Sequence, residues 1–251
     1  MKPCFPEVDA LTFDFYNTLV HHRTHRGRGE TLMEYLLECG LESDPWEHQV
    51  LYDVFDRHEI EYSPEQPTQE KELYVRQLAE RVFRRLNVRA PDGTAADHAA
   101  NLWNLLGPAS LAVFPEVTDV LRLVKAAGYP LAVVSNWQCG LRNFCVELGF
   151  GHAFDHVLAS AEVGSAKPDA AIFNEACRRL KVPAHRVLHI GDNLADDFAG
   201  GRNAGLHVVL VRREQEPEDL EVPTIPSLNR LPELLGLSVQ IPLRRQDTKK
   251  H

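Results

Sequence analysis

The side chains that could carry chemistry stand mostly at the ends of short apolar segments, far apart in the sequence. They are carboxylates, hydroxyl groups, an amide and a lysine: Asp14, Thr18, Ser135, Asn136, Lys167, Asp192, Asp196 and Asp197. A carboxylate in such a set can act as a nucleophile, while hydroxyl groups and a lysine can bind an anionic group. The remaining acids can hold a divalent cation. The set therefore suits attack on an electrophilic centre that bears negative charge.

Short segments rich in valine, isoleucine and leucine end at or near several of these residues. They span residues 8–14, 129–136, 154–160, 186–192 and 205–211, and each has the composition of a strand that is buried on both faces. Amphipathic segments with helical spacing alternate with them, at 115–128, 140–150, 170–182 and 196–205. This alternation predicts an α/β fold with a parallel, doubly wound sheet.

The predicted sheet explains how distant residues can share one site. In a doubly wound sheet, the loops at the carboxyl ends of adjacent strands meet at one edge. Asp14 ends the first strand, Ser135 the second and Asp192 the fourth, and a loop supplies Lys167. We therefore expect these side chains to converge.

The stretch from residue 20 to about residue 113 interrupts the alternation. Helical spacing recurs there without strands, at 31–41, 46–62, 69–88 and 92–107, which predicts a helical insertion after the first strand. The basic segment 241–251 is expected to be a solvated tail.

Composition limits the classes of partner. The chain has 251 residues, of which 44% are hydrophobic, and this is enough for a sizeable core with an insertion. A formal net charge of -9 at pH 7 argues against general binding of nucleic acid or of an anionic membrane. A small anionic substrate would need a local positive pocket, and Lys167 can provide one.

Cysteine usage indicates a reducing compartment. The five cysteines are scattered and include no C-x-x-C pair, so neither a disulfide framework nor a zinc site is predicted. The N-terminal segment lacks a signal-type apolar region and no apolar stretch is long enough to span a membrane. We expect a cytoplasmic protein. No feature of the sequence specifies an oligomeric state.

The order of the motifs resembles that of the haloacid dehalogenase superfamily of hydrolases. The pattern D-x-x-x-T begins at Asp14, S-N at Ser135, K-P at Lys167 and G-D-x-x-x-D-D at Gly191. The resemblance implies a Rossmann-like core formed by residues 1–20 and 114–240, with residues 21–113 as an inserted helical cap. It also implies an enzyme whose substrate is selected by the cap.

Further implications of the resemblance concern individual residues. Asp14 would be the nucleophile that forms a covalent aspartyl intermediate, and Lys167 would pair with it and with substrate oxygens. Thr18, Ser135 and Asn136 would bind the transferring group. Asp192 would coordinate Mg²⁺ together with Asp14 and the backbone carbonyl of Tyr16, and either Asp196 or Asp197 would complete the metal site.

Tyr16 departs from the pattern of the phosphatases in this superfamily. They usually carry a second aspartate two residues after the nucleophile, where it protonates the leaving oxygen and later activates water. A phenol has an ordinary pKa near 10 and is a poor base at neutral pH. Losing general acid–base catalysis typically lowers a rate by about 10²- to 10⁴-fold.

Two alternatives to a Mg²⁺-dependent phosphatase therefore stay open. The 2-haloacid dehalogenases of the same superfamily have a tyrosine-like residue at this position, because halide leaves without a proton. Those enzymes use no metal, however, and have small hydroxyl residues in place of Gly191 and Asp192. The second alternative is a catalytically weak protein that keeps the phosphate and metal pocket.

Overall fold

The computed structural model describes residues 5, 7–23, 28–44, 68–137, 139–213 and 222–237. The helix expected at 46–62 and the tail at 241–251 lie outside the described residues. Among the described helices, none is both long and apolar enough to cross a membrane. Four of the five cysteines lie in the described ranges, and all four are free thiols (Cys39, Cys139, Cys145 and Cys177).

A parallel sheet forms the centre of the fold. Within the described residues it contains six strands in the order β5-β4-β1-β6-β7-β8, and every neighbouring pair is parallel. The strands are β1 (Ala10–Phe13), β4 (Leu131–Ser135), β5 (His156–Ala159), β6 (Val187–Gly191), β7 (His207–Val211) and β8 (Thr224–Ile225). The predicted α/β fold is therefore confirmed.

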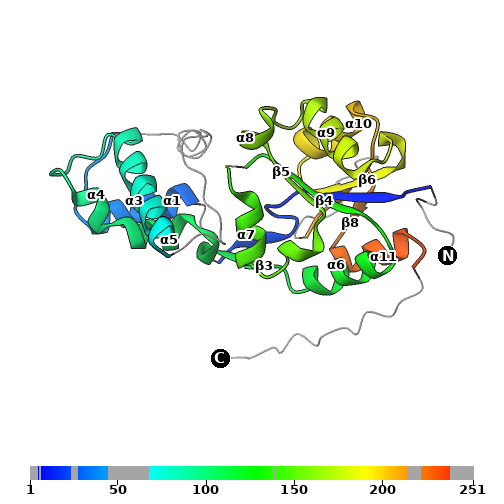
Figure 1. Ribbon diagram of the computed structural model, residues 1–251, viewed down its shortest axis with the longest axis horizontal. Helices are drawn as coiled ribbons and strands as arrows, with labels where there is room; N and C mark the ends of the chain where they lie inside the picture. Colours follow the sequence, from blue (N-terminus) through cyan, green and yellow to red (C-terminus); the bar gives the residue numbers. More distant parts are fainter. Residues whose placement is uncertain are drawn as a thin grey trace.

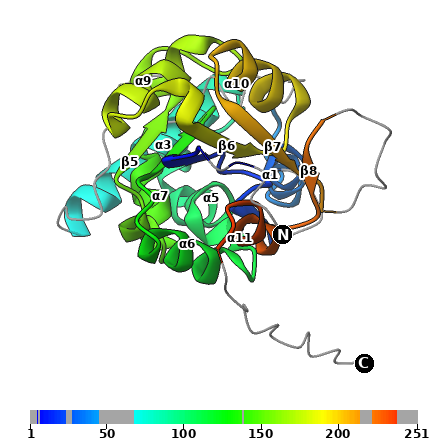
Figure 2. The same cartoon turned by 90° about the vertical axis from the view of Figure 1, so that its right-hand side faces the viewer.

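Helices cover both faces of the sheet, as Figure 2 shows. On one face lie α8 (Ser160–Val163), α9 (Ala170–Leu180) and α10 (Gly200–Asn203); on the other lie α6 (Val117–Ala126), α7 (Leu141–Glu147) and α11 (Leu231–Leu234), and Figure 1 labels all six. Side chains along β1 alternate between these layers. Leu11 and Phe13 join the buried cluster with α6 and α7, whereas Ala10 joins the cluster with α9. Burial on both faces accounts for the continuous apolar character of these strands.

The helical insertion lies to one side of the sheet (Figure 1). Its described helices are α1 (Arg28–Glu38), α3 (Thr68–Arg85), α4 (Thr94–Asp97) and α5 (Ala99–Leu106). They share a buried cluster of their own, which includes Leu32, Leu78 and Leu102. Two short antiparallel strands, β2 (Val20–His22) and β3 (Leu111–Val113), connect this helical unit to the sheet.

Several elements differ from the sequence-based expectation. The helix expected at 196–205 is a π-helix at Leu194–Ala199 followed by α10, and the helix expected at 92–107 is divided between α4 and α5. The short strands β2, β3 and β8 were not predicted, because two or three residues are too few for a periodic pattern. Short 3₁₀ segments occupy Pro108–Ser110, Gly151–Ala153, Ala184–Arg186 and Leu228–Arg230.

Candidate active site

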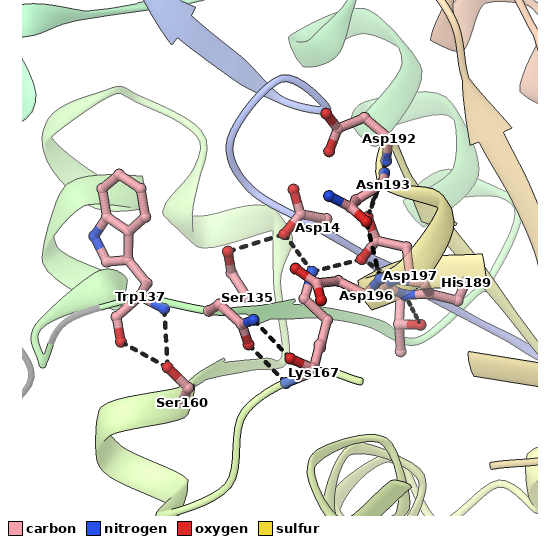
Figure 3. A network of polar contacts seen from close by, with 12 residues as sticks. Asp14, Ser135, Trp137, Ser160, Lys167, His189, Asp192, Asn193, Asp196 and Asp197 are labelled. Atoms are coloured by element: carbon pink, nitrogen blue, oxygen red, sulfur yellow. Dashed lines mark hydrogen bonds and ion pairs between the residues drawn. The ribbon is translucent and has the colours of Figure 1, made fainter. Parts of the chain in front are cut away.

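Three neighbouring strands bring the predicted residues to one edge of the sheet. Strand β1 lies between β4 and β6, so Asp14 follows the central strand, Ser135 ends one neighbour and Asp192 follows the other. The backbone N–H of Asp14 donates to the carbonyl of Ile190 at 2.8 Å, which extends the pairing by one residue. Figure 3 shows the resulting network of polar contacts.

Asp14 is buried at the centre of this network, with only 5% of the residue exposed. Its Oδ1 accepts hydrogen bonds from Ser135 Oγ at 2.9 Å and from Lys167 Nζ at 2.6 Å. Burial raises the pKa of Asp14 above its ordinary value, and the Lys167 ammonium opposes this rise. The ammonium therefore favours the ionised form of the buried Asp14 carboxylate.

Lys167 bridges two buried carboxylates. Its Nζ also donates to Asp197 Oδ1 at 2.5 Å, and the lysine side chain is 3% exposed. Burial alone would lower the pKa of Lys167, but the charges of Asp14 and Asp197 outweigh it and hold the pKa above its ordinary value. The lysine is thus a fixed positive charge beside Asp14.

Asn136 holds the backbone of the loop that carries Lys167. Its Nδ2 donates to the Lys167 carbonyl at 2.9 Å, and its Oδ1 accepts from the Lys167 N–H at 2.7 Å. Both ends of the amide are therefore committed to the lysine's backbone. This pairing places the Lys167 loop directly beside the end of β4.

Asp197 is the acid of the G-D-x-x-x-D-D motif that faces the lysine. Beyond Lys167 it accepts from His189 Nε2 at 3.0 Å and from the backbone N–H groups of Asp192 and Asn193 at 3.0 and 2.9 Å. Burial alone would raise the pKa of Asp197, but the lysine and His189 hold it below its ordinary value. A side chain at Gly191 would place Cβ 2.2 Å from Asp197 Cγ, so glycine is required there.

Asp192 completes an acidic cluster. Carboxylate oxygens of Asp14, Asp192 and Asp197 all lie within 4.8 Å of one another, a grouping that could hold a metal ion. Burial, followed by the charges of Asp14 and Asp197, raises the pKa of half-buried Asp192 to about 7. Repulsion of this kind is relieved when a divalent cation binds.

Asp196 stands apart from this cluster. Its backbone N–H donates to Asn193 Oδ1 at 2.9 Å, and the same oxygen accepts from the Ala195 N–H at 2.8 Å. Asn193 is therefore the residue that caps the π-helix. Of the two acids that the sequence left as alternatives, the structure brings Asp197 to the lysine and to the clustered carboxylates.

The loop after Asp14 carries Tyr16 and Thr18. Thr18 is fully buried, and its Oγ1 has no hydrogen-bond partner within the described residues. Tyr16 is half-buried, and its ring centroid lies 5.0 Å from that of His22 on β2. Asn17, which lies between Tyr16 and Thr18, has a φ of 59°, an uncommon value for a residue other than glycine. The loop turns back so sharply that the Asn17 N–H donates to the Val20 carbonyl at 2.7 Å.

Sequence reasoning missed His189. It is fully buried on β6, where Nδ1 contacts Thr12 Oγ1 at 2.9 Å and Nε2 contacts Asp197. Thr12 and His189 are directly paired in the β1–β6 register. Both are polar residues inside strands that are otherwise apolar, and this was the one available signal. Nε2 donates to Asp197, because an ionised carboxylate can only accept.

Comparisons with known proteins identify the class to which this fold and site belong. A buried carboxylate, a lysine and an acidic cluster at the carboxyl edge of a doubly wound sheet suit a hydrolase that uses covalent catalysis. A family model for haloacid dehalogenase-like hydrolases matches residues 8–205. The chain belongs to this family.

Individual relatives carry different names. The chain is 36% identical over 141 residues to a glyceraldehyde 3-phosphate phosphatase from Methanothermobacter thermautotrophicus, covering 51% of this chain and 60% of that relative. It is 26% identical over 233 residues to haloacid dehalogenase-like hydrolase domain-containing protein 3 from Danio rerio, covering 90% and 95% of the two chains. The crystal structure of an HAD phosphatase from Thermococcus onnurineus superposes with a TM-score of 0.62 at 19% identity, covering 91% of this chain and 98% of that one. The last comparison supports the fold.

The bridge formed by Lys167 generates a prediction about stability. Replacing Lys167 by methionine leaves Asp14 and Asp197 as buried carboxylates without a cation, so the free energy of unfolding should fall by about 3–5 kcal/mol at pH 7.5. The deficit should shrink toward pH 5, because the unpaired carboxylates can then take up protons. Denaturant unfolding at both pH values measures the effect.

The matched control is Lys125→Met, which removes a surface partner of Asp155 at 2.6 Å with side chains 38% and 42% exposed. An exposed pair of this kind contributes up to about 1 kcal/mol. Equal losses in the two lysine variants would contradict the assignment of Lys167 as a buried bridge.

Proposed function

We propose that the protein is a Mg²⁺-dependent phosphatase-type hydrolase in which Asp14 attacks a small phosphorylated metabolite. The supporting observation is the contact of Lys167 Nζ with Asp14 Oδ1 at 2.6 Å, beside the cluster of three carboxylates. The phosphatase name of one relative agrees with this class of substrate. The fold alone would leave the chemistry open.

In the proposed reaction, a carboxylate oxygen of Asp14 forms a bond to phosphorus while the bond from phosphorus to the leaving oxygen breaks. The resulting aspartyl phosphate is then hydrolysed by water, which releases phosphate and restores the carboxylate. Ser135 and Lys167 orient Asp14 before attack, and Lys167 offsets negative charge on the phosphoryl oxygens. The buried hydroxyl of Thr18 supplies a further donor for the transferring group.

The residues present fit a hard divalent cation. Carboxylate oxygens are the ligands that Mg²⁺ prefers. Burial, followed by the charges of Asp14 and Asp197, raises the pKa of Asp192, and a cation would offset both effects. Asp14, Asp192 and the backbone carbonyl of Tyr16 would hold Mg²⁺, which supplies charge compensation between the nucleophile and the phosphoryl group. Both oxygens of Asp197 already accept two donors each, so we assign Asp197 to holding Lys167.

Tyr16 favours a second candidate, a metal-independent 2-haloacid dehalogenase. A phenol at this position is compatible with a leaving group that needs no proton. The acidic cluster weighs against this candidate, because displacement of halide from a 2-haloacid needs no cation. A binding protein that has lost efficient turnover is the third candidate.

The first prediction from this proposal concerns metal binding and pH. The pKa of Asp192 in the metal-free folded protein, about 7, lies above the ordinary value near 3.9 that an unfolded chain has. Its proton therefore stabilises the fold at low pH, and this contribution is lost as the pH rises toward 7. Mg²⁺ competes with the proton. It should stabilise the protein by about 1–3 kcal/mol at saturation near pH 8 and much less near pH 6.

Thermal unfolding in Mg²⁺ and in EDTA measures this effect. Asp192→Asn should abolish the metal-dependent shift, whereas Asp196→Asn, on the same loop but outside the cluster, should retain it. A melting temperature that ignores both Mg²⁺ and EDTA across this pH range would refute the metal site and favour the dehalogenase.

The second prediction concerns the leaving group. Because Tyr16 is a weak acid–base catalyst, p-nitrophenyl phosphate and acyl phosphates should be hydrolysed far faster than sugar phosphates. Tyr16→Asp should raise turnover of alkyl phosphates by about ten-fold or more and change acyl phosphate turnover less. Steady-state rates on matched preparations test this.

Asp14→Asn is the control and should remove turnover of every ester, with or without the change at Tyr16. Halide release from 2-haloacids without Mg²⁺, and no gain from Tyr16→Asp on any phosphate, would instead establish the dehalogenase. Inactivity on both panels with Mg²⁺ and phosphate still bound would support the binding protein.

A further inference from the structure

Arg213, two residues beyond the end of β7, contacts both segments that connect the sheet to the helical insertion. We call residues 14–22 the outgoing segment and residues 111–117 the returning segment. On the outgoing segment, its Nη2 donates to the Thr18 carbonyl at 2.9 Å and its Nε donates to the Asn17 carbonyl at 3.4 Å. On the returning segment, its Nη1 donates to Glu116 Oε1 at 2.5 Å. The guanidinium carbon also lies 3.4 Å from the ring centroid of Phe114.

The contacts of Arg213 with Glu116 and with the Thr18 carbonyl are partly shielded from solvent. The side chain of Arg213 is 17% exposed and that of Glu116 is 8% exposed, so their ion pair is screened less than a surface pair. A planar guanidinium can donate in several directions at once while one face packs on an aromatic ring. A lysine could keep the charge but would lose most of this geometry.

The two segments also contact each other close to Arg213. The Phe114 N–H donates to the Leu19 carbonyl at 3.1 Å, and Val20 pairs with Val113 where β2 meets β3. Figure 1 shows β3 at the junction between the helical unit and the sheet. Arg213 therefore lies where the chain leaves the sheet and returns to it.

The outgoing segment needs such support. It carries Thr18 four residues after Asp14, and the positive φ of Asn17 is a conformation that persists only when its surroundings hold it. The carbonyls of Asn17 and Thr18 are the groups that Arg213 binds. Fixing these carbonyls fixes the backbone that carries the buried Thr18 hydroxyl.

We propose that Arg213 is a positioning residue that fixes the Asp14–Thr18 loop in register with the two connections to the helical insertion. Arg213 thereby couples the placement of Thr18 to the placement of the helical unit. The catalytic consequence rests on the proposed phosphatase function, but the structural coupling does not.

Hydrogen exchange of backbone amides, followed by mass spectrometry, tests the coupling without reference to activity. In Arg213→Met, exchange should rise at least five-fold in peptides covering residues 14–22 and also in peptides covering 111–117. Peptides covering β6 should be unchanged. Arg178→Met, at an exposed arginine on α9 that pairs with Glu175, is the control for loss of a positive charge and should leave both segments as in the parent protein.

A double-mutant cycle with Glu116→Gln adds a second readout. Because Arg213 and Glu116 contact each other, the change in exchange of the double variant should be smaller than the sum of the changes in the single variants. Compared with Arg213→Met, Arg213→Lys should restore part of the protection from hydrogen exchange in the returning segment and little in the outgoing segment. If Arg213→Met fails to fold, Arg213→Lys and Glu116→Gln carry the same comparison.

Turnover of p-nitrophenyl phosphate gives the catalytic consequence. Arg213→Met should raise KM by about ten-fold and change kcat less. Contacts that do not involve Arg213 hold the other two groups: Asp14 bonds to Ile190 and Ser135, and the Lys167 backbone bonds to Asn136. If the parent protein shows no turnover, the proposed function fails while the exchange result still decides the coupling. Exchange that matches Arg178→Met, or that rises in one segment alone, would overturn the proposal.

Discussion

The buried ammonium of Lys167 between Asp14 and Asp197 is the interaction on which the rest of the site depends. Three carboxylates lie in one cluster at the sheet edge, and burial alone would drive protons onto them. The lysine, at 2.6 Å from Asp14 and 2.5 Å from Asp197, favours the charged form of both. The lysine ammonium, which is fixed in place, therefore opposes the protonation of these buried carboxylates.

Much of the surrounding structure holds the Lys167 ammonium and its partner Asp197 in place. Asn136 holds the backbone of Lys167, and His189 together with two backbone N–H groups holds Asp197. These supports come from β4, from β6 and from the loop that follows β6, all packed between helical layers. Stability and chemistry are therefore linked here, because removing one member leaves another buried charge unpaired.

The sequence was sufficient to predict the sheet and the convergence of its strand ends, because burial on both faces produces long apolar runs that end on polar residues. It could not decide between Asp196 and Asp197, since the choice depends on a π-helix and on contacts that no periodicity reports. His189 and Arg213 were also beyond sequence reasoning. His189 acts through a cross-strand pair with Thr12 and through Asp197, and Arg213 reaches carbonyl groups almost 200 positions away in the chain, with sequence separations of 196 and 195.

The claim that Asp14 is the nucleophile can be tested directly with beryllofluoride, which mimics a phosphoryl group on a carboxylate. A crystal structure of the protein with Mg²⁺ and beryllofluoride should show beryllium bonded to a carboxylate oxygen of Asp14, with Ser135 and Lys167 in contact with the fluorines. Asp14→Asn should lose this adduct while keeping its fold. Beryllofluoride bound elsewhere in the parent protein, or retained unchanged in Asp14→Asn, would contradict the account.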